Sequence, residues 1–284
     1  MATEFQHVSD TALWVASYRA EESRRPDALF RDPLAERLAG DKGREISRNV
    51  TGSMYTRWNV VMRTCIIDRF IQQAAKNGVD LIVNLGAGLD TRPYRMELPA
   101  SLAWVEADFP HMMDAKEAAL VGEEPRVRLE RVRVDLSDPG ARGRFLDEMQ
   151  ARGRKIMAIT EGVLPYLTNE QAADLAKDLR KRDHIRYWVA DYMSKEVTEY
   201  LRKGKFRKQL KNAPFEFHPG DWFGFFENLG WKAREVRYLS DESRAQNRPI
   251  PRPLLLKLLW PFIPAKKRIE MSRWTAYVVL EPKG

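Results

Sequence analysis

The strongest constraint on the fold is a regular alternation of apolar strands and helical stretches that begins at residue 81. We expect strands at residues 81–85, 103–107, 128–134, 156–160, 186–190, 232–238 and 274–280. Helical stretches separate the first five strands, at residues 92–98, 111–120, 140–152 and 171–182. This alternation is the βαβ signature of an α/β fold with a doubly wound, mostly parallel sheet. A long excursion separates the last two strands, which predicts an antiparallel pair at one edge.

The N-terminal region has a different pattern. Apolar residues recur at helical spacing over residues 11–22, 33–39 and 54–76, and we expect these helices to cap the top of the sheet. We see neither a linker nor a repeat, so we predict one domain over residues 1–284, with a helical cap at 1–78 and an α/β core at 79–284. The core contains an insertion at 240–271, which prolines break up. We interpret it as a lid packed on the body; an alternative is a patch that contacts a bilayer surface or an apolar substrate.

Composition excludes several classes of protein. The single cysteine, Cys65, excludes a disulfide framework and a cysteine-based metal site, and we predict no metal. The polar N-terminus and the lack of an apolar run of about 20 residues predict a cytoplasmic protein. The net charge of +8 is compatible with nucleic acid or an acidic membrane surface. No nucleic-acid-binding signature accompanies the basic runs, so we expect no nucleic-acid partner, and peripheral membrane contact is a secondary alternative.

Acidic residues follow consecutive strands of the predicted sheet. The first strand closes on Asn84 and a glycine turn, and the next four close on acids: Asp108, Asp135, Glu161 and Asp191. In an open parallel sheet, ligands bind at the carboxyl ends of the strands. One such acid is weak evidence, because aspartate is also a common helix N-cap. Four acids on one edge predict a binding site there.

The glycine turn itself narrows the choice of ligand. It reads Gly86-Ala87-Gly88-Leu89-Asp90-Thr91, without the third glycine of a dinucleotide fingerprint or the lysine of a phosphate loop. Asp90 would place negative charge where phosphates sit, which argues against a nicotinamide oxidoreductase. A nucleoside with a positive centre and no phosphate fits better. S-adenosyl-L-methionine has this character, with a sulfonium, an ammonium, a ribose diol and a neutral adenine.

The predicted ligands of this cofactor lie at the strand ends. They are Gly86, Ala87 and Gly88, then Asp108 and Phe109, then Asp135 and Leu136, then Glu161. The glycines admit the methionine part close to the backbone, and Asp108 would accept hydrogen bonds from the ribose hydroxyls. Asp135 would accept one from the adenine amino group, and the Leu136 N–H would serve a ring nitrogen. Glu161 would face the ammonium. Arg63 is the candidate for the cofactor carboxylate; the alternative is an ordinary exposed helix arginine.

Seven stretches carry a resemblance to a known family. They are "SDTALWVASYRAEES", "FRDPLAERLAG", "VVMRTCIIDRFI", "VNLGAGLDTRPYRM", "VEADFP", "VDLSD" and "TEGVLPYL". The sequence resembles the leucine carboxyl methyltransferase family over residues 9–167. In particular it resembles the bacterial branch of S-adenosylmethionine-dependent methyltransferases, which includes polyketide carboxyl O-methyltransferases of the tetracenomycin type. The combination of "GAGLDTRPYR" with "EGVLPYL" is specific.

The resemblance implies the seven-stranded, Rossmann-like class I methyltransferase fold and S-adenosyl-L-homocysteine as product. It supports the roles given to the residues above, including Arg63 for the cofactor carboxylate. The branch that methylates a protein C-terminal leucine has a basic residue near the N-terminal helix. Here that stretch reads "TALWVASYR", and the nearest cation is Arg19. The segment after Asp191 does not resemble a protein-substrate surface, so we expect a small-molecule acceptor.

The acceptor is predicted to be small and acidic or aromatic, and methylated on a carboxyl oxygen. A carboxylate is ionised at neutral pH and needs no general base, whereas a phenol usually does. We place none of the four histidines beside Glu161. Tyr166 is the candidate for orienting the acceptor, with a core or lid tyrosine as the alternative, and Arg19 is a candidate for holding an anionic acceptor. A hydroxyl or phenol acceptor stays open, as does a basic protein that binds nucleic acid or a membrane surface.

Overall fold

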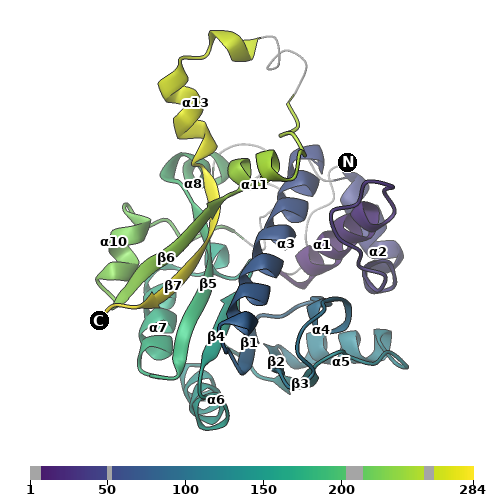
Figure 1. The fold of residues 1–284 in the computed structure, drawn as a ribbon, viewed down its shortest axis with the longest axis vertical. Coiled ribbons are helices and arrows are strands. Elements are labelled where there is room, and N and C mark those ends of the chain that lie inside the picture. The colour runs from purple at the N-terminus through teal and green to yellow at the C-terminus, as the bar shows by residue number, and fades with distance from the viewer. Residues whose placement is uncertain (1–7, 50–52, 203–213, 253–258) are drawn as a thin grey trace.

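The computed structural model describes residues 8–49, 53–202, 214–252 and 259–284. A seven-stranded sheet in the order β3-β2-β1-β4-β5-β7-β6 runs through the molecule (Figure 1). The strands are β1 Leu81–Leu85, β2 Ala103–Asp108, β3 Arg128–Arg133, β4 Ile156–Thr160, β5 Ile185–Met193, β6 Trp231–Tyr238 and β7 Thr275–Pro282. The first five strands pair in parallel, and β7 lies antiparallel between β5 and β6. The predicted sheet, with its antiparallel last strand, is therefore confirmed.

The helices lie close to their predicted positions. They are α1 Val8–Ser23, α2 Ala35–Asn49, α3 Ser53–Lys76, α4 Arg92–Arg95, α5 Pro110–Ala119, α6 Pro139–Arg152, α7 Asn169–Arg180, α8 Lys195–Arg202, α10 Trp222–Glu227, α11 Leu239–Ala245 and α13 Ala265–Ser272, with 3-10 turns η1 Leu164–Tyr166 and η2 Trp260–Phe262. Helix α4 is shorter than predicted because Met96 is already extended. Helix α2 is longer, and it continues through a kink at Gly40, whose φ is 57°.

The N-terminal helices cover two different parts of the sheet. Helices α1 and α2 pack against each other, and Leu89 of the glycine turn joins Met112 and Met113 of α5 in the same apolar cluster. This pair caps the sheet as predicted. Helix α3 instead lies along one face of the sheet, where Figure 1 shows it in front of β1 and β4. The apolar residues of α3, among them Phe70, are buried against that face, so only part of the N-terminal region caps the strand ends.

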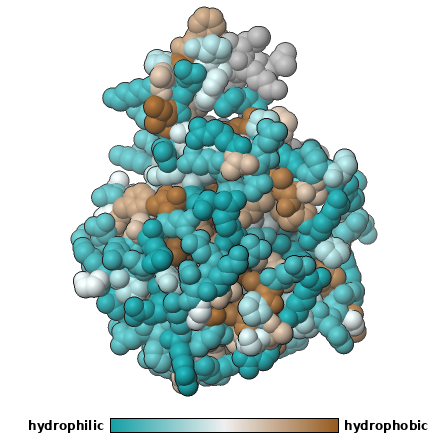
Figure 2. Space-filling view, viewed as in Figure 1, coloured by the Kyte–Doolittle hydropathy of each residue, from teal (hydrophilic) through white to brown (hydrophobic). Residues whose placement is uncertain are grey.

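The predicted insertion projects from the body beyond β6 and β7. It contains α11, η2 and α13, and it forms the uppermost part of the molecule in Figure 1. Figure 2 shows hydrophobic and hydrophilic side chains side by side on this part. The central leucine-rich stretch, residues 253–258, lies outside the described residues. Among the helices that the structure describes, none is long and apolar enough to cross a membrane.

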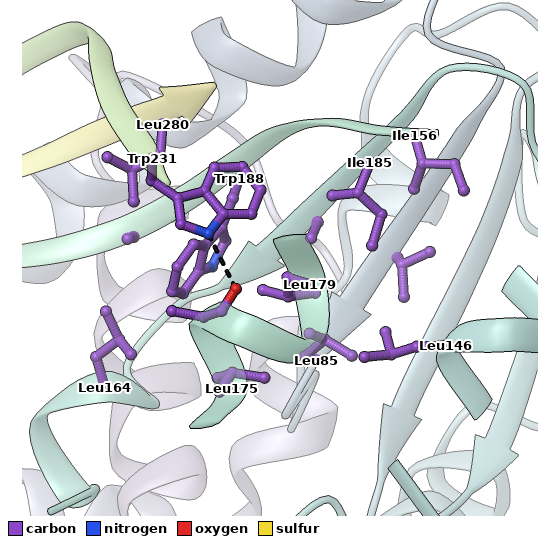
Figure 3. Close-up of a cluster of buried hydrophobic side chains, with 14 of the residues drawn as sticks. Leu85, Leu146, Ile156, Leu164, Leu175, Leu179, Ile185, Trp188, Trp231 and Leu280 are labelled. Atoms are coloured by element: carbon purple, nitrogen blue, oxygen red, sulfur yellow. Dashed lines mark hydrogen bonds between the residues drawn. The ribbon is translucent and has the colours of Figure 1, made fainter. Parts of the chain in front are cut away.

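Alternation along the strands divides the apolar residues between two faces. Leu81, Val83 and Leu85 of β1 face α6, α7 and α10, whereas Ile82 between them faces α3. On the first face, Trp188 lies in the centre of the cluster drawn in Figure 3, and its Nε1 donates to Thr160 Oγ1 at 2.9 Å. Because helices cover both faces of the sheet, a ligand has access at the carboxyl edge of the strands.

Candidate active site

A cavity of about 1680 Å³ lies at the carboxyl edge of the sheet. Its inner end is formed by the strand-end segments that the sequence indicated. The predicted residues that line it are Arg19, Arg63, Gly86, Ala87, Gly88, Asp108, Phe109, Leu136, Glu161 and Tyr166. The structure thus brings ten predicted site residues, from six separate segments of the chain, to one cavity.

The glycine turn is held in a conformation that favours glycine. Gly86 has a φ of 71° and Gly88 a φ of 48°, both in the left-handed region. A Cβ on Gly86 would lie 2.6 Å from Val163 Cγ2, so a side chain has no room there. The Gly86 N–H donates to the carbonyl oxygen of Ala107 at 2.8 Å, which ties the turn to β2. Both glycines line the cavity at the position predicted for the methionine part of the cofactor.

Asp108, the last residue of β2, is fixed by the backbone on both sides. Its Oδ2 accepts a hydrogen bond from Gly88 N at 2.7 Å, and its Oδ1 accepts one from Phe109 N at 2.7 Å. Burial raises the pKa of Asp108, and these two bonds oppose that shift. A carboxylate has about four acceptor positions, so two remain for a ligand such as a diol.

Glu161 and Arg63 form an ion pair on the cavity wall. Arg63 Nε lies 2.8 Å from Glu161 Oε1, and both side chains are 15% exposed. Arg63 therefore lies in the cavity rather than on an exposed helix surface. Burial alone would raise the pKa of Glu161, but Arg92 and Arg63 outweigh it and hold this pKa below its usual value. Glu161 thus carries its negative charge at neutral pH.

Arg92 is the centre of a buried charge network beneath this pair. Its Nη1 lies 2.7 Å from Glu161 Oε2 and 2.9 Å from Asp90 Oδ2, and its Nε donates to Asp68 Oδ1 at 2.6 Å. Asn84 Nδ2 also donates to Asp90 Oδ2, at 2.9 Å. The Asp90 carboxylate therefore stabilises the turn and is neutralised by Arg92. The expectation that the charge of Asp90 opposes bound phosphates was therefore wrong in its reason, because Arg92 pairs with that charge inside the protein.

Asp191 and Tyr277 also line the cavity, although the sequence predicted no specific contact for either residue. The Gly162 N–H donates to the Asp191 carboxylate, at 3.0 Å to Oδ2, and Tyr277 hydrogen-bonds to the same group. Burial raises the pKa of Asp191 to about 6, against the opposing effects of the Gly162 bond and Arg63. Asp191 was visible in the sequence as a strand-end acid. Tyr277 had no such signal, because β7 reaches the site from the far end of the chain.

Two predicted residues lie differently from our expectation. Asp135 is exposed, its Oδ1 accepts hydrogen bonds from Ser137 N and Oγ, and the residues that line the cavity there are Val134, Leu136 and Ser137. The cause is local: the carboxylate caps the turn that follows β3. Arg19 is buried, with Nε 2.8 Å from Asp32 Oδ2 and Nη2 donating to Leu89 O at 2.6 Å. Its guanidinium supports the glycine turn, which leaves little of it to hold an acceptor.

Tyr166, the last residue of η1, lines the cavity five residues after Glu161. Its ring contacts Phe215 edge-on with centroids 5.1 Å apart, and its hydroxyl hydrogen-bonds with the Thr11 side chain of α1. Burial raises the pKa of Tyr166, so the hydroxyl stays protonated. Among the described residues no histidine lines the cavity, and the ring of His218 contacts the Glu216 carbonyl oxygen.

This combination of sheet order, glycine turn and strand-end acids defines a class I methyltransferase. A crystal structure from Thermobifida fusca, named as a methyltransferase, superposes with a TM-score of 0.55 over 98% of this chain and 95% of that one, at 14% identity. A second crystal structure, of a DUF574 family protein from Streptomyces avermitilis, gives a TM-score of 0.50 over 95% and 97% of the two chains, at 15% identity. These likenesses support the fold.

Sequence similarity identifies the family. The sequence model of the family described as leucine carboxyl methyltransferase matches residues 12–180. A Frankia alni protein, named as an S-adenosyl-L-methionine-dependent methyltransferase, is 31% identical over 86% of this chain and 90% of its own length. A Streptomyces avermitilis protein of the same designation is 31% identical over 89% and 94%. The chain therefore belongs to the leucine carboxyl methyltransferase family, and the predicted family, fold class and enzyme class are confirmed.

Proposed function

We propose that this enzyme transfers a methyl group from S-adenosyl-L-methionine to an oxygen atom of an organic acceptor, with a carboxyl oxygen favoured. S-adenosyl-L-methionine is the methyl donor, as it is by name for the relatives. The observation that carries the proposal is the Arg63–Glu161 ion pair beside Asp108 and the glycine turn. We also propose that residues 1–284 act as one domain, because α1 and the 240–271 insertion line the same cavity.

The side chains that line the inner end of the cavity match the chemistry of the cofactor. Its methionine part carries one carboxylate and one ammonium, and Arg63 and Glu161 offer the opposite charge to each. Gly86 lines the cavity where this part is proposed to bind, and Val163 leaves no space for a side chain at that position. Asp108 has the free acceptor positions that a ribose diol requires, and Leu136 lies on the cavity wall for the adenine. Asp135 would reach the adenine only after giving up its bonds to Ser137.

The bound cofactor supplies an electrophilic methyl group on a sulfonium, and the protein aligns the acceptor and excludes water. Tyr166 is proposed to orient the acceptor, because its protonated hydroxyl lies on the cavity wall. A carboxylate acceptor arrives ionised and needs no proton removed, which agrees with a cavity that histidine does not line in the described part of the chain. Holding both reactants in line is worth roughly 7–11 kcal/mol in reactions of this kind.

A hydroxyl acceptor is the second candidate, and one observation favours it. Asp191 is a buried carboxyl group on the cavity wall, and its pKa is raised to about 6. Such a group is suited to remove a proton from a hydroxyl near neutral pH. The two candidates differ in their dependence on Asp191.

The test uses labelled cofactor with matched pairs of aromatic acids and phenols, followed by mass spectrometry for the gain of one methyl group. We expect a methyl ester that alkali hydrolyses, with Tyr166→Phe lowering its rate and Asp191→Asn leaving most of it. A stable methyl ether, lost in Asp191→Asn, would replace the carboxyl candidate by the hydroxyl one. Failure to bind S-adenosyl-L-homocysteine would contradict the cofactor assignment itself.

A further inference from the structure

The cavity extends well beyond the segments assigned to the cofactor. Small-molecule sites usually measure about 300–1,000 Å³, and this cavity measures about 1680 Å³. Its outer half is formed by α8, α11 and the insertion. The residues that line it include Tyr200, Arg252, Trp260, Arg268, Ile269 and Trp274. A cofactor at the glycine turn would leave this outer half for the acceptor.

The wall of the outer half is mostly apolar. Tyr200 of α8 is 75% exposed and Ile269 of α13 is 62% exposed, and both still line the cavity. Trp260 of the insertion and Trp274, which directly precedes β7, also line the cavity. Exposed side chains of this kind are costly in water unless a ligand covers them. A small aromatic acid would contact few of them, whereas an acceptor with a bulky apolar body would cover many.

Positively charged residues outnumber negatively charged ones in the outer half of the cavity. Arg252 and Arg268 line it, and neither pairs with a carboxylate within the described ranges. The Arg252 guanidinium lies over the Trp260 ring, 3.7 Å from its centroid, so its position is fixed by stacking. Arg244 also lines this half but is paired with Asp241, and Glu196 is the acid on this wall. Two arginines without a carboxylate partner offer a site for a negative charge.

We propose that the acceptor is a bulky amphipathic acid, with an apolar body against Trp260, Ile269 and Trp274. In this arrangement a negative group, remote from the methylated oxygen, is bound by Arg252 and Arg268. The inference rests on the proposed function, since it takes the inner end of the cavity as the cofactor site. It proposes a larger acceptor than the sequence led us to expect, and it gives the insertion a role in selecting the substrate.

Binding titrations test this proposal without requiring turnover. The full-length protein is titrated by calorimetry with benzoate, anthracene-2-carboxylate, dodecanoate and the neutral anthracene-2-methanol, with and without S-adenosyl-L-homocysteine. The single carboxylate of each acid represents the remote negative group in this binding test. We expect the two bulky acids to bind at least tenfold more tightly than benzoate. Comparison of anthracene-2-carboxylate with dodecanoate shows whether the cavity prefers a polycyclic or an acyl body. Equal affinities for benzoate and both bulky acids would overturn the proposal.

Matched variants separate the cavity wall from the rest of the insertion. Ile269→Asn should weaken both bulky acids several-fold, whereas Phe262→Asn should not, because Phe262 is 82% exposed but does not line the cavity. Arg252→Gln with Arg268→Gln should remove about a tenfold preference for the anthracene acid over its alcohol, and Lys266→Gln should keep it. An unchanged preference in the double arginine variant would contradict the anionic site. If the protein failed to bind S-adenosyl-L-homocysteine but still bound the bulky acids, only the cofactor assignment would be contradicted.

Discussion

Arg63 Nε lies 2.8 Å from Glu161 Oε1, so the two residues proposed to bind the opposite charges of the methionine part neutralise each other in the protein. We predict that Arg63→Gln weakens the binding of S-adenosyl-L-homocysteine by about tenfold to a hundredfold, since it removes a charge-assisted contact to the ligand carboxylate. Methylthioadenosine lacks that carboxylate and should lose little affinity. Calorimetry with both ligands measures the difference.

The matched control for this prediction is Arg57→Gln. Arg57 is on the same helix, pairs with Glu21 at 2.6 Å and has a side chain that is 47% exposed. Its replacement should change neither affinity. If Arg63→Gln weakened the two ligands equally, Arg63 would act on the shape of the site and not on the carboxylate.

Asp108 and Asp135 are expected to differ, although the sequence placed both at strand ends. Asp108→Asn should weaken the binding of S-adenosyl-L-homocysteine and of methylthioadenosine alike by about tenfold, because both ligands carry the ribose that the carboxylate would bind. Asp135→Asn should change either affinity by less than about twofold, since Asp135 is exposed and bonded to Ser137. A large effect of Asp135→Asn would restore its predicted contact with adenine.

The glycine turn yields a prediction about stability. Gly86→Ala should lower the free energy of unfolding by about 2–4 kcal/mol, because it adds a steric clash with Val163 to the cost of a positive φ. Gly122→Ala isolates the second effect: its φ is 85° and nothing lies within 4 Å of the added Cβ. That variant should lose only about 1 kcal/mol. Urea denaturation of both variants measures the difference, and equal losses would refute the clash.

The fold was predictable because it depends on local patterns. Alternating apolar strands, such as residues 81–85, and the glycine turn after them fix the sheet and the edge at which a ligand binds. The acids that follow the strands were equally visible. Asp108 and Glu161 reach the cavity because parallel strands end together at one edge of the sheet.

The pairing of those side chains was not predictable from their positions alone. Whether Asp135 faces a ligand or caps its own turn depends on rotamers and on Ser137, two residues further on. Arg19 is bound by Asp32 and by the Leu89 carbonyl oxygen, which is 70 residues away in the sequence. Such contacts are decided by tertiary packing, and a single sequence holds no periodic signal for them.

Asp191 gives the molecule a pH dependence of a particular sign. Burial raises its pKa to about 6 from an ordinary value of 3.8, so between about pH 4 and pH 6 the folded state keeps a proton that the unfolded state has released. Stability must then fall as the pH rises through this window, by about 3 kcal/mol for a shift of about two pH units. The charged groups that face Asp191 are Arg63 from α3 and Glu161 after β4, with the Tyr277 hydroxyl from β7.

Asp191→Asn should remove this slope, because the amide accepts from Gly162 without titrating. The measurement is the difference in unfolding free energy between the two proteins at pH 4, 5, 6 and 7, by urea denaturation. The wild type should lose stability relative to the variant as the pH rises.

The Asp90→Asn variant should show a pH dependence of the opposite sign. Burial alone would raise the pKa of Asp90, but Arg92 and Lys116 outweigh it and hold this pKa far below its usual value, so its ionised form stabilises the fold at neutral pH. The wild type should therefore exceed the Asp90→Asn variant in stability by a constant margin between about pH 5 and pH 7, and the margin should shrink only below about pH 4, so this pair is measured at pH 2 and 3 as well. Parallel slopes for the two variants would show that neither carboxylate titrates as its surroundings require.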